Sequence, residues 1–524
     1  MDIDWGRMLS QVAKRFPDKE AIVNIERDRR FTFMELHLLT NKICNMLKDR
    51  FGLARGDIFA TILDNDNISL LHFWMFKGEA TPAFLNYRDS FEEHIWQLDY
   101  ASPKLCFIEN ELLDRYYDAL RERSIEIICM DPVSGEREGV FYFWDLLENA
   151  SDAETGVIKD FEDETVLIRF TGGTTGKGKS AMYTIRNLMG PMGAMHGFYE
   201  ELITRRTRFL NITPLSHATS LFVLPIYFKG ATLVTMNVPD LKAFLANVQN
   251  EKITSTLLVP TILYRFLEVE VEKMFDLSSL DMVFYGASPM SPDKLRGLQK
   301  KFGNIFIQAY GSTEAVPPVT ILGKEEHADE SEEGVARLSS AGCVCPGWEV
   351  FIADDDGNEI AEGETGEIWI RGPGVIKGYY QNPEQTDAEF KDGYWLSGDM
   401  GYMDRKGYVY IVDRKKDMII TGGFNVYAAE VEDSLNSHPA VLMAAVVGIP
   451  HPEWGEAIHA EVILREGEQV EELDLIEWCK DKKGKYKAPK SITFVSELPL
   501  SAAGKVLRKN VRDKYWKDEE RRVH

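Results

Sequence analysis

A loop rich in glycine, threonine and lysine is the first place in this sequence where the residue types suggest chemistry. Residues 171–180 read TGGTTGKGKS and follow a short apolar run at 166–168. Glycines let backbone N–H groups converge on an anion without Cβ clashes, while the hydroxyls add donors and the lysines add charge. This composition predicts a phosphate-binding loop.

The same loop also satisfies the Walker A pattern of a P-loop, because residues 173–180 read GTTGKGKS. A P-loop should lead into a helix and be followed by an apolar strand that ends in a magnesium-binding aspartate. Residues 181–195 contain glycines and a proline and are a poor helix start, and the best aspartate candidate lies far along the chain, in 350–356. A P-loop NTPase is therefore the weaker of two interpretations of this loop.

Polar or small residues also follow three predicted strands further along the chain. His217 ends the stretch 209–217, and by itself it is more typical of a structural histidine. Small residues follow the strand 282–285, which suggests close approach of the backbone to a ligand. The strand 305–309 leads into YGSTE at 310–314, which offers a ring for stacking, hydroxyls for phosphate and a carboxylate for magnesium. This last motif predicts a nucleotide site.

Basic residues gather near the end of an otherwise acidic chain. Residues 481–490 contain five lysines, although the formal net charge of the chain is −24. Such a local reversal of sign indicates either a solvated loop or a seat for a polyphosphate ligand. Lys505 follows small residues at 501–504 and indicates nothing by itself. The overall acidity argues against non-specific nucleic-acid binding, which needs a basic face.

Alternating helices and strands must position these residues. Helical periodicity covers 4–16 and 31–53, and a capping box of Thr32 and Glu35 opens the second helix. Strands expected before residue 342 cover 20–24, 57–63, 105–108, 125–130, 209–214, 231–235, 255–259, 282–285 and 305–309. This alternation predicts an α/β fold with mostly parallel sheets.

A chain of 524 residues is too long for one core, so more than one domain is expected. From about residue 342 short strands and glycine turns predict a small β-rich subdomain over 342–413. A charge run at 413–417 marks the predicted boundary between a large N-terminal domain, 1–413, and a small α+β C-terminal domain, 414–524. In the latter we expect helices at 430–436 and 473–480 and strands at 441–447 and 457–464.

Cysteine usage and the absence of a visible targeting signal predict a cytoplasmic protein. The six cysteines are scattered, and Cys343 with Cys345 lacks the partner pair of a zinc site, so buried free thiols in a reducing compartment are expected. The first residues do not resemble a secretory signal, and no apolar run approaches the roughly 18 residues of a transmembrane helix. The sequence leaves a homodimer and peripheral contact with a membrane open.

Six motifs occur in one order along the chain: TGGTTGKGKS, PLSH, YGSTE, SGDMGY, DRKKDMIITGGFNVYAAEVE and LPLSAAGKVLRK. Together they resemble the acyl-adenylate-forming superfamily, which includes AMP-forming acyl-CoA synthetases, firefly luciferases and peptide-synthetase adenylation domains. The match runs from about the first strand to the last helix. The resemblance implies ATP and coenzyme A as substrates with Mg²⁺ as cofactor, and it displaces the P-loop interpretation.

The resemblance also implies roles in nucleotide binding. Donors of the phosphate loop would hold the β- and γ-phosphates, Tyr310 would stack near adenine, and Asp399 with Arg414 would bind the ribose hydroxyls. Thr313 would contact the α-phosphate and Glu314 would bind magnesium. The implied nucleotide-binding set is Thr171, Gly173, Thr174, Thr175, Gly176, Lys179, Gly286, Ala287, Tyr310, Gly311, Ser312, Asp399 and Arg414.

Lys505 matches the catalytic lysine of this superfamily. The incoming carboxylate and the α-phosphate repel each other, and charge gathers on the non-bridging oxygens, so a lysine placed between them stabilises the transition state. The carboxylate is the nucleophile, and no general base is needed. The implied catalytic set is Lys505, Thr313, Glu314 and His217.

Three residues depart from the superfamily's phosphate loop. Gly172 stands where serine is usual, Gly178 where proline is usual and Ser180 where glycine is usual. Loss of the serine and the proline predicts a more mobile loop with one donor fewer, which bears on ATP affinity and not on the reaction class.

For the second half-reaction, the resemblance implies that the C-terminal domain swings about a hinge at Lys416. Gly422 and Gly423 would line the tunnel for the CoA thiol, because a chain without Cβ lets the pantetheine arm pass closely. Lys487, together with the lysines at 482, 483 and 485, would contact the phosphates of CoA.

The acyl pocket of the superfamily corresponds here to 218–222, 285–288 and 308–309, a set that carries no charge. A hydrophobic acid is implied, because a second charge on the substrate would lack a partner. The whole chain resembles fatty-acid ligases, which favours a fatty acid over an aryl acid. We expect a CoA ligase first, a stand-alone acyl-AMP ligase that loads a carrier protein second, and a luciferase-like oxygenase last.

Overall fold

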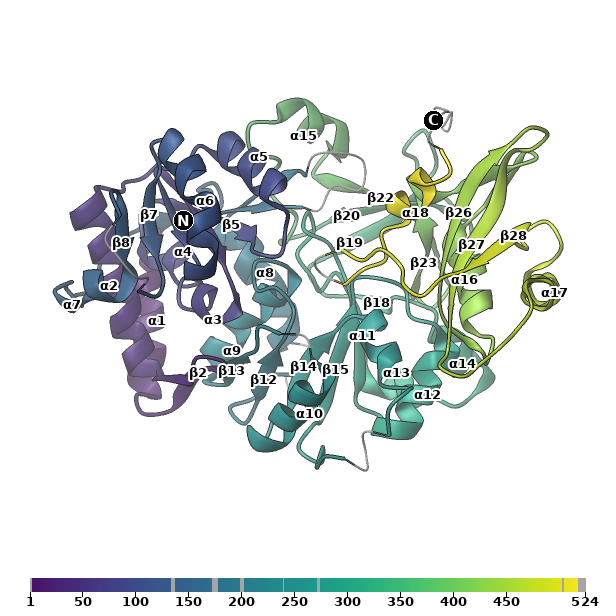
Figure 1. Cartoon of the computed structure of the whole chain (residues 1–524), viewed down its shortest axis with the longest axis horizontal. Helices are drawn as coiled ribbons and strands as arrows, with labels where there is room; N and C mark the ends of the chain where they lie inside the picture. Colours follow the sequence, from purple (N-terminus) through teal and green to yellow (C-terminus); the bar gives the residue numbers. More distant parts are fainter. Residues whose placement is uncertain are drawn as a thin grey trace.

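The computed structural model describes residues 2–132, 137–171, 178–197, 202–238, 240–270, 274–501 and 504–516. The molecule is mixed α/β, as the sequence predicted, with a large N-terminal part of sheets and helices followed by a smaller C-terminal part. The N-terminal elements lie at one end of the long axis, and β26 to β28 lie near the other end (Figure 1).

The first large sheet has seven strands in the order β11-β10-β5-β4-β6-β7-β8. Strands β10, β5, β4, β6, β7 and β8 run parallel, and β11 joins the edge antiparallel to β10. The strands are β4 (Ile58–Leu63), β5 (Thr81–Asn86), β6 (Leu105–Ile108), β7 (Glu126–Cys129), β8 (Val140–Tyr142), β10 (Leu167–Phe170) and β11 (Ser180–Tyr183). Burial on both faces explains why these strands are apolar almost throughout.

The second large sheet has nine strands in the order β18-β17-β16-β15-β14-β12-β13-β2-β3. Its six central strands, from β16 to β2, are parallel, and the outer strands are antiparallel. The strands are β2 (Glu20–Asn24), β3 (Arg29–Thr32), β12 (Arg208–Asn211), β13 (Thr232–Thr235), β14 (Ser255–Leu258), β15 (Met282–Gly286), β16 (Phe306–Tyr310), β17 (Thr320–Leu322) and β18 (Cys343–Val344). Parallel strands place their carboxyl ends at one edge, where polar side chains can meet.

Helices cover these two sheets and connect their strands (Figure 1). Helix α2 begins with the predicted capping box, in which Thr32 and Glu35 exchange hydrogen bonds of 2.8 and 3.2 Å. The helices before the β-rich region are α1 (Trp5–Arg15), α2 (Phe33–Phe51), α3 (Asn65–Ile68), α4 (Trp74–Lys77), α5 (Phe91–Ala101), α6 (Asn110–Glu122), α7 (Phe143–Glu148), α8 (Ile185–Gly197), α9 (Val223–Lys229), α10 (Leu241–Asn250), α11 (Pro260–Arg265), α12 (Pro292–Phe302), α13 (Lys324–Ala328) and α14 (Glu332–Arg337). A short pairing of β1 (Asp2–Ile3) with β9 (Lys159–Asp160) completes this part.

Two five-stranded sheets form the rest of the chain. The predicted β-rich segment is an antiparallel sheet of β19 (Glu349–Ala353), β20 (Gly366–Arg371), β21 (Phe390–Lys391), β22 (Tyr394–Met403) and β23 (Val409–Arg414), with α15 (Pro383–Glu389). The last sheet contains β24 (Ile419–Thr421), β25 (Phe424–Val426), β26 (Val441–His451), β27 (Gly455–Leu464) and β28 (Ser491–Phe494), with α16 (Ala428–Asn436), α17 (Glu472–Lys483) and α18 (Arg508–Asp513). One apolar cluster of this sheet draws on residues between Ile419 and Ile492, while Met443, Ala445 and Val447 of β26 belong to a core that includes the second large sheet.

The chain that follows the glycine-rich loop decides between its two interpretations. Strand β10 leads into the loop, and strand β11 leaves it antiparallel to β10. A Walker A loop opens a helix instead. The topology therefore contradicts the P-loop interpretation and places the predicted phosphate loop between two strands of a hairpin.

The predicted state of the cysteines is confirmed, because all six are free thiols and five of them are buried. In the part of the chain that the structure describes, every helix is too short or too polar to span a membrane.

Candidate active site

The predicted base and ribose residues occupy the end of one strand of the second large sheet and two strands of the neighbouring β-rich sheet. Strand β16 ends at Tyr310, whose hydroxyl donates to Asp399 Oδ2 on β22 at 2.8 Å. Arg414, at the end of β23, approaches Asp399 Oδ1 to 3.5 Å with its Nε. Burial raises the pKa of the Asp399 carboxyl, and the positive charge of Arg414 opposes that shift. Three residues predicted for base and ribose are thus one connected group.

The YGSTE motif is a tight turn held by Ser312. The Ser312 hydroxyl accepts hydrogen bonds of 3.0 Å from the backbone N–H groups of Glu314 and Ala315. A Cβ on Gly311 would lie 2.8 Å from the Ala315 carbonyl oxygen, so the turn needs glycine there. Tyr183 on β11 donates to the carbonyl of Thr313 at 2.7 Å and joins this turn to the phosphate-loop hairpin.

Gly286 and Ala287, at the end of β15, have constrained backbones. A Cβ on Gly286 would stand 2.2 Å from the carbonyl oxygen of Ala309 on the neighbouring strand β16. Ala287 follows with a φ of 68°, a left-handed conformation that is uncommon for any residue with a Cβ. Packing of the two strands therefore accounts for Gly286, and the predicted contact with a ligand stays a prediction.

The ends of the phosphate loop close on each other. The Thr171 N–H donates to the Lys179 carbonyl at 2.7 Å, and the Lys179 N–H donates to the Thr171 hydroxyl at 3.2 Å. A Cβ on Gly178 would lie 2.4 Å from the Thr171 carbonyl oxygen, so glycine permits this closure. Ser180, the other described departure, donates to the Tyr380 carbonyl at 3.1 Å. The remaining predicted loop residues, Gly172, Gly173, Thr174, Thr175 and Gly176, lie outside the described residues.

Two residues that the sequence did not single out connect Lys179 to Glu314. The Tyr379 hydroxyl donates to Glu314 Oε1 at 3.1 Å and also to Glu389, while Glu389 forms an ion pair with Lys179. The Lys179 ammonium also stands 5.1 Å from the centre of the Tyr379 ring. Neither Tyr379 nor Glu389 belongs to a sequence motif. Their contacts could not be predicted, because only the fold brings α15 beside Lys179.

Glu314 fits the predicted magnesium site. Mg²⁺ in nucleotide sites takes one or two protein carboxylates and completes its shell with phosphate oxygens and water. Glu314 supplies one carboxylate next to the phosphate-loop lysine network, so the donor set suits that mode of binding. In the described part of the chain no group of three or more acidic, histidine or cysteine residues could hold a metal without substrate.

Lys505 reaches this group from the far end of the chain. Its turn is fixed by the Ser501 N–H, which donates to the Lys505 carbonyl at 2.7 Å, and by the Thr261 hydroxyl, which donates to the Gly504 carbonyl at 2.7 Å. Burial and the nearby Arg414 lower the pKa of the Lys505 ammonium to about 8, against the opposing effect of Asp399 and Glu314. Residues almost two hundred positions apart in the sequence therefore share one site.

His217 also lies close to this group. Burial lowers the pKa of its imidazole to about 4, and the charges of Arg169 and Lys505 contribute in the same direction. The ring is therefore neutral at neutral pH. Its Nδ1 is 3.4 Å from the Ser216 hydroxyl. The structure brings His217 beside the reacting groups but gives it no proton-transfer partner among the described residues.

Arg169 is the residue that the sequence analysis missed. It lies on β10 two positions before Thr171, is 8% exposed, and donates through Nη2 to the Ser220 hydroxyl at 2.6 Å. Ser220 belongs to the segment 218–222, which the sequence assigned to an uncharged acyl pocket. The segment itself is uncharged, but a guanidinium from another strand contacts it. A strand of buried residues rarely contains arginine, so the arginine in the strand before TGGTTG was a signal that could have revealed this residue.

The predicted CoA residues are not in contact with the nucleotide group among the described residues. Gly422 and Gly423 form the turn between β24 and β25 with φ values of 58° and 84°. Lys487 Nζ forms an ion pair with Glu430 at 2.6 Å. The rings of Phe424 and Tyr486 are 5.4 Å apart, so the glycine turn and the lysine-rich segment are neighbours.

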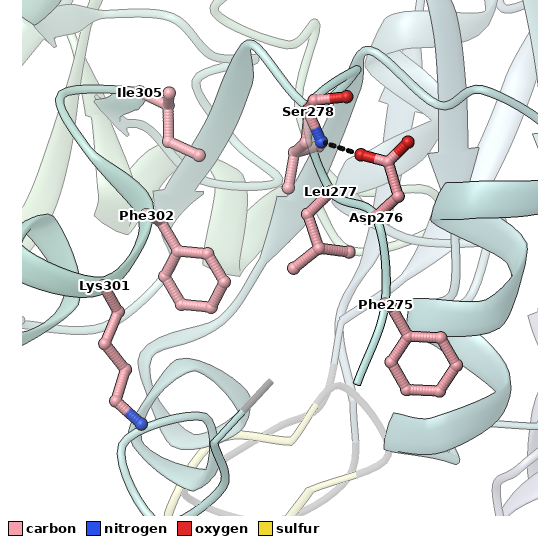
Figure 2. A pocket seen from close by; sticks show the side chains of 8 residues that line it. Phe275, Asp276, Leu277, Ser278, Lys301, Phe302 and Ile305 are labelled. Carbon is pink, nitrogen blue, oxygen red and sulfur yellow. Dashed lines mark hydrogen bonds between the residues drawn. The ribbon is translucent and has the colours of Figure 1, made fainter. Parts of the chain in front are cut away.

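Figure 2 shows a separate cavity of about 380 Å³ between α12 and the segment before β15. Apolar side chains dominate its lining, and the Ser278 N–H donates to Asp276 within it at 3.1 Å. None of the predicted site residues lines this cavity, so it does not belong to the site described above.

Comparison with known proteins identifies the family to which this chain belongs. The AMP-binding enzyme family model matches residues 9–380, and the model of its C-terminal domain matches residues 430–505. The chain belongs to the AMP-binding enzyme family, which confirms the superfamily predicted from the six motifs. The predicted fold class is confirmed as well.

Individual relatives agree with this assignment. The medium/long-chain-fatty-acid–CoA ligase FadD8 of Mycobacterium tuberculosis is 38% identical over 368 residues, which cover 69% of this chain and 63% of that protein. The indoleacetate–CoA ligase of Aromatoleum aromaticum is 33% identical over 502 residues, 95% of each chain. The ATP-bound structure of MatB from Rhodopseudomonas palustris is 26% identical, covers 99% of each chain and has a TM-score of 0.87.

Proposed function

We propose that this enzyme is an AMP-forming ligase that activates a hydrophobic carboxylic acid with ATP and transfers the acyl group to CoA. The observation that carries the proposal is the connected group of Tyr310, Asp399 and Arg414, whose charges act on Lys505. Relatives that match almost the full chain are named as acid–CoA ligases, which supports the same reaction class.

In the first half-reaction, the acid's carboxylate attacks the α-phosphorus of ATP and pyrophosphate leaves. Asp399 and Arg414 would hold the ribose, and the Thr171–Lys179 loop would hold the outer phosphates. Glu314 would hold Mg²⁺, which supplies charge neutralisation to the phosphates when it is bound. Lys505 would stabilise the charge that develops between carboxylate and α-phosphate, and the buried surroundings strengthen that interaction.

In the second half-reaction, the CoA thiol attacks the acyl-AMP carbonyl, and AMP leaves. Gly422, Gly423 and Lys487 would serve this step, and the contacts described for them lie within the C-terminal part of the chain. We therefore assign the described arrangement to adenylation and infer that residues 414–524 turn about Lys416 between the steps. Lys416 stands at the junction of the β-rich sheet and the C-terminal sheet, within the 3₁₀ turn Lys415–Asp417.

The class of acid is proposed from the predicted acyl segments and from the named activities of relatives. The uncharged segments 218–222 and 308–309 favour a largely apolar acyl group, and the named activities of relatives include both a fatty acid and an arylacetic acid. We favour fatty acids, with magnesium-dependent activity in the cytoplasm.

A panel of fatty, aryl and dicarboxylic acids tests the proposal. The purified enzyme is supplied with ATP, Mg²⁺ and CoA, and thioesters are identified by mass spectrometry. We expect thioester formation with one class of apolar acid. Turnover of none of these acids, by an enzyme that still binds ATP, would contradict the proposal.

A further inference from the structure

Arg169 is a buried cation that pairs with no carboxylate in the part of the chain that the structure describes. Its side chain is 8% exposed, its Nε has no hydrogen-bond partner, and no described carboxylate forms an ion pair with it. The contacts it does make are neutral: the Ser220 hydroxyl at 2.6 Å and the face of the Tyr183 ring, 5.0 Å away. An arginine stays charged at any physiological pH, so this burial is unfavourable unless an anion arrives.

The neighbours of Arg169 place it at the junction between acyl group and nucleotide. On one side, Ser220 donates to the His217 carbonyl at 2.8 Å and lies within the predicted acyl segment 218–222. On the other side, the Tyr183 hydroxyl donates to the carbonyl of Thr313, the residue expected at the α-phosphate. The positive charges of Arg169 and Lys505 both act on His217. The guanidinium therefore lies where the carboxylate of an acid must meet the α-phosphate.

We propose that Arg169 binds the carboxylate of the acid substrate and orients it for attack on ATP. This inference rests on the proposed function and deepens it. A guanidinium binds a carboxylate through paired N–H groups, and it offsets the repulsion between that carboxylate and the phosphates. Once acyl-AMP has formed, the carboxylate charge is gone. Arg169 then has no further part in thioester formation.

Two other anions could occupy this position, and the order of the reaction distinguishes them. A second carboxylate on the acyl group would remain present in acyl-AMP, so Arg169 would matter equally in both half-reactions. The α-phosphate would make Arg169 matter for ATP as much as for the acid. The acid's own carboxylate is the anion that every substrate of this reaction carries, and it alone disappears after the first step.

Replacement of Arg169 by methionine tests the proposal through the two half-reactions. We expect the KM for the acid to rise at least about tenfold, the loss typical of one charged hydrogen bond, with the KM for ATP nearly unchanged. Thioester formation from supplied acyl-AMP and CoA should continue at a rate close to that of the unaltered enzyme. Arg169→Lys, which keeps the charge, should recover part of the affinity for the acid.

A stability measurement separates this role from a structural one. Arg208, at the amino end of β12, is a matched control, because it pairs with Glu20 at 2.8 Å and Glu251 at 2.6 Å. Arg208→Met should lower Tm and leave the KM for the acid unchanged. Arg169→Met should leave Tm unchanged or raise it, because it removes an uncompensated charge.

Three results would overturn the proposal. An Arg169→Met enzyme with an unchanged KM for the acid would show that Arg169 does not bind the carboxylate. Equal loss in both half-reactions would assign it to another part of the acyl group, and an equal rise in the KM for ATP would assign it to phosphate. Failure of the unaltered enzyme to release AMP with any acid would instead refute the proposed function.

Discussion

At the scale of single residues, charge in a buried site decides what each side chain can do. Lys505 and Arg169 are both cations whose charges act on His217, the first from the C-terminal turn and the second from β10. The pKa of Lys505 is lowered to about 8 because burial and Arg414 disfavour its charge more than Asp399 and Glu314 favour it. The two residues should therefore respond differently to substitution and to pH.

Lys505→Ala should reduce acyl-AMP formation by roughly two to three orders of magnitude, the usual effect of removing a group that stabilises transition-state charge. Thioester formation from supplied acyl-AMP should be largely intact, because that step does not develop charge on the α-phosphate. Single-turnover assays of each half-reaction measure both effects. Equal loss in the two steps would contradict the role assigned to Lys505.

Adenylation should also depend on pH through Lys505. The charged ammonium is the active form, so kcat/KM for adenylation should be level below the pKa and fall as pH rises through about 8. The Lys505→Arg variant is the control, because a guanidinium does not titrate in this range and its slower reaction should show no such fall. A profile for the unaltered enzyme that stays flat well above pH 9 would count against this account.

At the scale of elements, a buried ionic group fixes the turn that carries Lys505. Arg508, three residues further on at the start of α18, contacts Asp413 Oδ1 at 2.6 Å, Glu432 Oε2 at 2.6 Å and Asp417 Oδ2 at 3.5 Å. These partners come from β23, α16 and the 3₁₀ turn beside Lys416. Several elements thus depend on one side chain, whose pKa the carboxylates raise well above its ordinary value.

Arg508→Met should destabilise the C-terminal sheet by about 3–5 kcal/mol, because it leaves buried carboxylates without a cation. Thermal unfolding should show a transition at a lower temperature than in the unaltered protein. The rate of adenylation should also fall, because the turn that carries Lys505 is no longer held in place. Arg465→Met is a suitable comparison, since Arg465 makes a peripheral pair with Glu268 at 2.5 Å. If both variants unfold at the same temperature as the unaltered protein, the ionic group has no such role.

Element prediction from the sequence worked where the signal was local. The capping box at Thr32 is read from neighbouring residues and is present as predicted, whereas the role of the loop after β10 in phosphate binding stays a prediction. Tyr379 and Glu389 could not be found that way, because their contacts with Glu314 and Lys179 depend on how distant segments pack. The departure at Gly178 permits a close approach to Thr171, and its predicted effect on the mobility of the loop stays a prediction.

At the scale of the whole molecule, the two sets of predicted residues belong to different sheets. The nucleotide set surrounds Asp399, whereas Gly422 lies in the turn between β24 and β25 and Lys487 pairs with Glu430 on α16. We infer that the C-terminal part reorients between the two steps.

Lys416→Pro should hold the molecule in the adenylation arrangement, because proline fixes φ near −65°, a value that suits the 3₁₀ turn at Lys415–Asp417. We expect near-normal pyrophosphate release in a single turnover and a large loss of thioester formation. Lys415→Pro, one position earlier, is the control for a general effect of proline in this turn. Normal overall turnover by Lys416→Pro would contradict a hinge at this residue.

The fate of ATP tests the central claim most directly. A substrate acid from the panel is supplied with ATP and Mg²⁺, with and without CoA, and AMP, ADP, pyrophosphate and thioester are measured together. The account predicts one AMP, one pyrophosphate and one thioester per acid with CoA, and a single enzyme-bound acyl-AMP without it. Continuous pyrophosphate release that ignores CoA would indicate an enzyme that serves another acceptor, and release of ADP would contradict the account.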